Sequence, residues 1–153
     1  MGYGDGMATV TASVEVSAAP QRVWEVLVDP SRYGEWLDLH HGFAGEAPAA
    51  FTQGTSFGQK VKVLGMPSDV RWTVESVDPP NAITLEGTGP MGIGLRADYG
   101  VEAADVAQDA CRVTVAMDFS GPAVMMVAGQ LEREVGDQLR SSLAKLAAIS
   151  TQG

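Results

Sequence analysis

The hydrophobic positions of this chain follow two different periods. Apolar and polar residues alternate along six segments, which is the pattern of half-buried β-strands: residues 8–17, 56–64, 69–77, 82–87, 95–103 and 111–119. From Pro122 to Ile149 the period becomes helical, with an apolar stripe formed by Val124, Ala128, Leu131, Val135, Leu139, Leu143 and Leu146. At 1.5 Å per residue this helix would be about 40 Å long, enough to cross a whole domain.

A short helical region separates the first strand from the others. Pro20 suits the first turn of a helix, and Asp29-Pro30 ends that helix. Tyr33 and Trp36 belong to a second short helix that closes one end of the core. The Gly- and Ala-rich segment from residue 40 to about 53 is expected to be a loop.

Composition narrows the class of protein. The chain has 153 residues, of which 45% are hydrophobic and 19% charged, as in a globular protein. We expect one domain over residues 8–149, with flexible ends at 1–7 and 150–153. A net charge of −9 disfavours nucleic acids and anionic lipid surfaces as partners. No apolar run is long enough for an integral membrane segment, and the single cysteine, Cys111, fits a cytoplasmic protein.

The inward faces of the predicted strands carry few titratable groups. Tyr99 is the only hydroxyl-bearing aromatic residue expected to point inward, and the His40-His41 pair is a candidate acid or base near a pocket entrance. No third ligand accompanies the histidines at metal spacing, so no metal site is predicted. No motif in a suitable structural context predicts a cofactor. An apolar interior with so little acid–base chemistry favours hydrophobic binding.

Two sets of residues resemble known families. The segment VSAAPQRVWEVLVDPSRYGEW, residues 16–36, resembles the opening signature of the START-like (SRPBCC) superfamily, which includes the Bet v 1 allergens and the polyketide cyclase/dehydrase group. The segments EWLDLH, GMPSDVRWTV, LEGTG and FSGPA are similar to an actinobacterial subgroup, one member of which is described as the toxin of a toxin–antitoxin pair. The superfamily resemblance covers about residues 8–149.

The resemblance implies an α+β helix-grip fold. In that fold a seven-stranded curved antiparallel sheet wraps around the long C-terminal helix, and two short helices follow the first strand. A cavity between the sheet and the long helix would bind lipids, sterols or polyketide-like molecules. By position, the residues that would line it are Trp72, Tyr99, Met117, Phe119, Leu131 and Val135.

Three functions follow as hypotheses. The leading one is binding of a hydrophobic small molecule in that cavity. The second is a cyclase or dehydratase acting on an apolar ketone, with Tyr99 or a histidine near the mouth as the acid. The third is an interaction protein such as the toxin half of a pair. The sequence leaves undecided whether the chain forms a homodimer.

Overall fold

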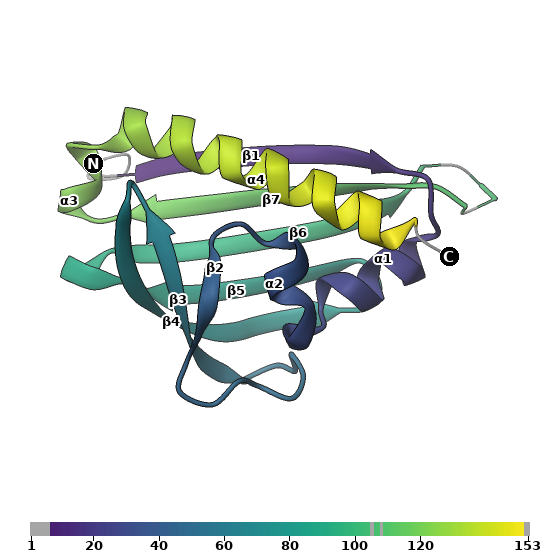
Figure 1. The fold of residues 1–153 in the computed structure, drawn as a ribbon, viewed down its shortest axis with the longest axis horizontal. Helices are drawn as coiled ribbons and strands as arrows, with labels where there is room; N and C mark the ends of the chain where they lie inside the picture. The colour runs from purple at the N-terminus through teal and green to yellow at the C-terminus, as the bar shows by residue number, and fades with distance from the viewer. Residues whose placement is uncertain (1–6, 105, 108, 152–153) are drawn as a thin grey trace.

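The computed structural model describes residues 7–104, 106–107 and 109–151. One antiparallel sheet of seven strands runs in the order β1-β7-β6-β5-β4-β3-β2. The strands are β1 (Met7–Val16), β2 (His40–Ala44), β3 (Ser56–Val63), β4 (Met66–Asp78), β5 (Ala82–Thr88), β6 (Gly94–Ala103) and β7 (Cys111–Ser120). The long helix α4 (Ala128–Ser150) lies across the concave face of the curved sheet (Figure 1). The expected helix-grip fold is confirmed.

Three short helical segments join β1 to β2. They are α1 (Pro20–Leu27), the 3-10 turn η1 (Pro30–Arg32) and α2 (Tyr33–Trp36). Pro20 occupies the first turn of α1, as predicted. The Asp29 side chain accepts a hydrogen bond from the Ser31 backbone N–H at 3.0 Å, which starts the next turn. Figure 1 shows α1 and α2 together at one end of the sheet, beside the C-terminal half of α4.

The seventh strand was not located by the residue pattern. The segment expected to be a loop from residue 40 begins with β2, which pairs with β3 at the edge of the sheet through Phe43 opposite Gln59 and Ala44 opposite Gly58. The register shifts between His40 and Phe43, and Gly42 has a φ of 125°. A bulge at this point breaks the apolar–polar alternation that identifies a strand.

The C-terminal helix begins later than predicted. Pro122–Met125 form a separate short helix, α3, and the backbone at Val127 (φ −125°, ψ 12°) is not helical. The continuous helix therefore starts at Ala128. Its predicted stripe is nonetheless correct, because the side chains of Leu131, Leu139 and their partners on the same face are buried against the sheet.

Regular secondary structure in the described residues spans 7–150. Met7 opens β1, and Ser150 closes α4 with its side chain fully buried. The Ser150 carbonyl accepts a hydrogen bond from Arg22 Nε at 2.6 Å, which ties the end of α4 to α1. The ends were expected to be flexible, and residues 1–6, 152 and 153 of those ends lie outside the described residues. Across the described ranges, no helix is long and apolar enough to cross a membrane.

Candidate functional site

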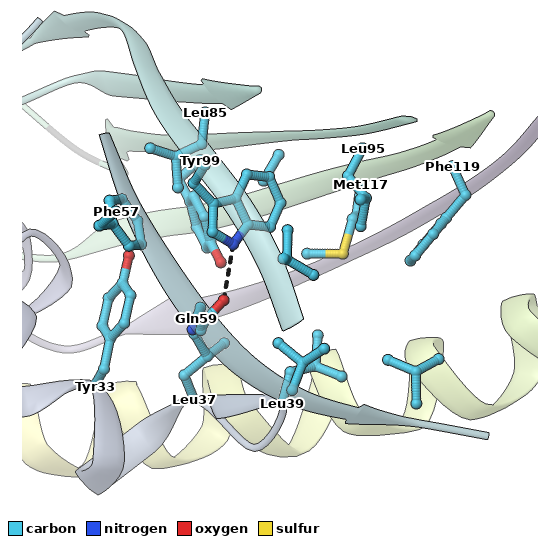
Figure 2. Close-up of a pocket in the computed structure, with 15 residues that line it drawn as sticks. Tyr33, Leu37, Leu39, Phe57, Gln59, Leu85, Leu95, Tyr99, Met117 and Phe119 are labelled. Carbon is cyan, nitrogen blue, oxygen red and sulfur yellow. Dashed lines mark hydrogen bonds between the residues drawn. The ribbon is translucent and has the colours of Figure 1, made fainter. Parts of the chain in front are cut away.

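A small cavity lies between the concave face of the sheet and the helices that cover it. Its volume is about 30 Å³. Fifteen residues from α2, its following turn and strands β3 to β7 line it, and nearly all present apolar side chains (Figure 2). A space of this size holds a water molecule or a single small functional group. The interior is therefore closely packed in this structure.

Gln59 is the polar centre of the cavity wall. It lies on the inner face of β3 and is 4% exposed. Its Oε1 accepts a hydrogen bond from Trp72 Nε1 at 2.9 Å, and its Nε2 lies 2.9 Å from His40 Nδ1 (Figure 2 marks the first). An indole N–H can only donate, so the amide oxygen must face Trp72 and the amide N–H₂ must donate to His40. This arrangement requires His40 Nδ1 to be unprotonated.

The surroundings of His40 favour that neutral form. Burial lowers the pKa of His40 below its ordinary value, and the neighbouring His41 lowers it further. The His40 ring packs edge-on against Phe43 and Tyr33, with centroids 4.7 and 5.5 Å away. Gln59, rather than His40, forms the cavity wall, so the imidazole is separated from the cavity by the amide.

A glycine makes room for the Trp72 ring. Gly87 on β5 lies directly opposite Trp72 on β4. A Cβ at Gly87 would come within 2.8 Å of the indole ring and of the Arg71 carbonyl. The absence of a side chain at this position therefore allows the indole to lie across the sheet, where its N–H reaches Gln59.

Two tyrosines enter the cavity from opposite sides. Tyr33 comes from α2 and is 4% exposed, whereas Tyr99 comes from β6 and is 5% exposed (Figure 2). Within the described part of the chain, neither phenol hydroxyl has a hydrogen-bond partner. The fully enclosed and unpaired side-chain polar atoms of the described residues are Trp36 Nε1 and Gln138 Oε1. The tyrosine hydroxyls are not among them, so each hydroxyl keeps some accessible surface.

Both phenols remain protonated at neutral pH. Burial raises the pKa of Tyr33 well above its ordinary value, with a further increase from nearby Tyr99. Burial likewise raises the pKa of Tyr99. Each hydroxyl is therefore a hydrogen-bond donor rather than a source of protons for a reaction.

A larger groove adjoins the cavity. Its volume is about 230 Å³, and its walls come from the β3–β4 turn, the β5–β6 turn and the start of α4. The residues that line both spaces are Val61, Val63, Val70, Leu95 and Phe119. Met66 and Met91, which are 65% and 78% exposed, stand on its rim. A backbone hydrogen bond from Leu64 to the Glu134 carboxylate joins the β3–β4 turn to α4.

Five of the six predicted site residues line the inner cavity, the groove or both. Trp72, Tyr99, Met117 and Phe119 line the inner cavity, and Phe119 also lines the groove. Leu131 lines the groove alone. Val135 is fully buried in the core and lines neither of the two.

Sequence reasoning placed Tyr33 in the short helix that closes one end of the core, but it missed the Tyr33 hydroxyl and the Gln59 amide as polar groups of the cavity. Gln59 carried a usable signal, because it is a polar residue on the inward phase of a strand whose other inward residues are apolar. Tyr33 carried little signal, because α2 has four residues and too few turns to define an inward face.

A curved antiparallel sheet closed on a long helix, with an apolar cavity between them, defines a helix-grip protein. A family model for polyketide cyclase / dehydrase and lipid transport proteins matches residues 7–150. The chain belongs to this family, and the expected place in the START-like superfamily is confirmed.

The similar proteins include a Mycobacterium tuberculosis protein named as a toxin. It is 30% identical over 142 residues, which cover 88% of this chain and 95% of the relative. Among solved structures, the Zhui aromatase/cyclase from a Streptomyces species has a TM-score of 0.73 at 19% identity, covering 94% of this chain and 93% of the other. A START superfamily protein from Mycobacterium smegmatis has a TM-score of 0.63 at 16% identity, covering 90% and 98%. These structures share the fold.

Proposed function

We propose that this chain binds a hydrophobic small molecule in the space formed by the inner cavity and the adjoining groove. The observation that carries the proposal is that two apolar spaces lie side by side and share five wall residues. Small-molecule sites are mostly apolar, with a few polar groups that orient the ligand. The family includes lipid transport proteins, which supports the same function.

The groove is the part of this space with room for a ligand's apolar body. Its rim carries exposed methionines, whose flexible thioethers adapt to ligands of different shapes. The inner cavity is smaller than any lipid or polycyclic molecule. Binding therefore requires side chains at the shared wall to move apart. Met117, which lines the inner cavity beside Leu95 and Phe119, has a flexible side chain that can adapt to this movement.

A groove-filling substitution tests this proposal. Ala123 lines the groove, whereas Ala148 is exposed on α4 and lines neither the groove nor the inner cavity. Nile red, a neutral apolar dye, should bind the wild-type chain saturably with a blue-shifted emission. Ala123→Trp should weaken this binding at least tenfold by filling the groove, and the matched Ala148→Trp should leave it unchanged. Equal binding by both variants, or no saturable binding by the wild type, would overturn the proposal.

An enzymatic function is the second candidate, and the two unpaired phenols favour it. A pair of protonated hydroxyls in an apolar cavity can polarise a ketone, as a cyclase or dehydratase of this family would require. The cavity lacks an acid–base partner for such a reaction, because Gln59 separates His40 from it. Turnover of a ketone that is lost in Tyr99→Phe would favour the enzyme. Turnover that survives this change and removal of both histidines would exclude these groups as the acid, and a wild-type chain without turnover of such ketones would count against the enzyme.

The toxin function rests on the names of two relatives, which come from two strains of Mycobacterium tuberculosis. A net charge of −9 gives no support to action on nucleic acid. Growth arrest on overexpression, relieved by a neighbouring small gene product, would favour this function, whereas unaffected growth would count against it.

A further inference from the structure

The inner end of the cavity has an excess of hydrogen-bond donors. Tyr33 and Tyr99 each present a phenol O–H without a partner. The side-chain amide of the lining, Gln59, accepts from Trp72 through its Oε1 and bonds to neither phenol. The Gln59 N–H₂ group donates to His40 and cannot turn around without opposing two donors at Trp72. Among the described residues, neither phenol O–H therefore has an acceptor in this structure.

These hydroxyls are held in place rather than free to turn away. The Tyr33 ring packs against Trp36 edge-on at 5.7 Å, Phe51 at 5.4 Å and Phe43 at 6.3 Å. The Tyr99 ring lies edge-on to Trp36 at 6.2 Å. Buried polar groups in native proteins are almost always hydrogen-bonded, so the two unpaired phenols leave two donors available to an acceptor that enters the cavity.

The charge of that acceptor is restricted by the lining. None of the fifteen lining residues is Asp, Glu, Lys or Arg. A carboxylate placed there would lose its hydration without gaining a cationic partner, which is strongly unfavourable. An uncharged oxygen loses far less hydration and gains the two donors.

We infer that the inner end of the cavity binds an uncharged oxygen acceptor, a carbonyl or ether oxygen, through the hydroxyls of Tyr33 and Tyr99. The ligand is then a neutral apolar molecule with one such oxygen at its inner end, and not a fatty acid anion. This inference rests on the proposed function. The inner space of about 30 Å³ accommodates one polar group, and the apolar body extends past Leu95 and Phe119 toward the groove.

Two sets of probes test the inference. Within each set the hydrocarbon skeleton is similar, and the members carry a ketone, no polar group or a carboxylate. The tricyclic set is 9-fluorenone, fluorene and fluorene-9-carboxylate, and the linear set is 2-tridecanone, tridecane and tridecanoate. Dissociation constants are measured by equilibrium dialysis at pH 7 for the wild type, Tyr33→Phe, Tyr99→Phe and the double variant. Thr73→Val, which deletes an exposed hydroxyl bonded to Ser56, is the matched control. Thermal unfolding establishes that each variant is folded.

The expected result is a preference for the ketone over the hydrocarbon of about tenfold or more in at least one set. The carboxylate should bind weakest. The double Tyr→Phe variant should lose the ketone preference while keeping its affinity for the hydrocarbon, and Thr73→Val should behave as wild type. Equal affinities for ketone and hydrocarbon, tightest binding of the carboxylate, or a ketone preference that survives in the double variant would overturn the inference and leave the proposed function standing. A wild-type chain that binds neither set would overturn both.

Discussion

His40 is the residue through which the polar centre of the site responds to pH. Its Nδ1 must accept a hydrogen bond from Gln59 for the amide oxygen to remain on Trp72. Protonation of His40 would place two donors against each other at this contact. The groups that face the ring are Gln59, Tyr33 and Phe43, with His41 next in the chain, so no carboxylate is among them to stabilise a charged imidazole.

The stability of the chain should therefore fall on mild acidification in a way that depends on His40. Because burial lowers the pKa of His40 in the folded state, the unfolded state takes up a proton first, near the ordinary value of 6.5. The stabilisation is fully present above that value and is lost as the pH falls through the lower folded-state pKa. Urea unfolding between pH 7.5 and 5 should show a smaller loss of stability in His40→Asn than in the wild type.

His41→Asn is the control for that measurement, because its side chain is exposed and adjacent in sequence. It should keep most of the wild-type pH dependence. Carboxylates also titrate toward pH 5, so the comparison is made between variants and not against a flat baseline. A His40→Asn variant with the same pH dependence as the wild type would show that the Gln59–His40 contact does not govern this transition.

At the scale of elements, two side chains of α4, Ser142 and Lys145, hold the turn that follows α2. Ser142 on α4 is 1% exposed, and its hydroxyl accepts from the Asp38 backbone N–H at 2.8 Å while donating to the Gln138 carbonyl at 2.7 Å. Lys145 on the same helix pairs with the Asp38 carboxylate. These contacts fix the turn that follows α2, and hence the position from which Tyr33 enters the cavity.

Ser142→Ala should reduce the free energy of unfolding by about 1–2 kcal/mol, because it leaves the Asp38 N–H without its partner. Urea denaturation gives the value, with Ser76→Ala on the exposed side of β4 as a control expected to change stability by less than about 0.5 kcal/mol. A Ser142→Ala variant as stable as the control would mean that water replaces the lost hydroxyl.

Individual strands and helices differ in how well the sequence predicted them. β7 was located closely because its inward and outward residues alternate without interruption, and the stripe on α4 was correct because 23 residues define a period well. β2 was missed because its bulge at Gly42 breaks the alternation. The start of α4 was misplaced because Val127 carries no local signal of its non-helical backbone. The unpaired phenols depend on tertiary packing, which no local pattern contains.

At the scale of the whole molecule, an acidic surface encloses an interior with almost no charge. The net charge is −9, yet no charged side chain lines the inner cavity. The curved sheet and α4 enclose this interior from both sides (Figure 1), and the groove beside α3 and the start of α4 adjoins it. We expect this contrast in a protein that separates an apolar molecule from water, as proposed above.

Native mass spectrometry of the chain purified from its own host tests this account most directly. The account predicts a noncovalent adduct of defined mass that organic solvent releases and that Ala123→Trp, purified in the same way, carries in much smaller amount. The released molecule should be neutral and contain oxygen. A spectrum that shows only the mass of the bare chain, and that gains no adduct when Nile red is added, would contradict the account.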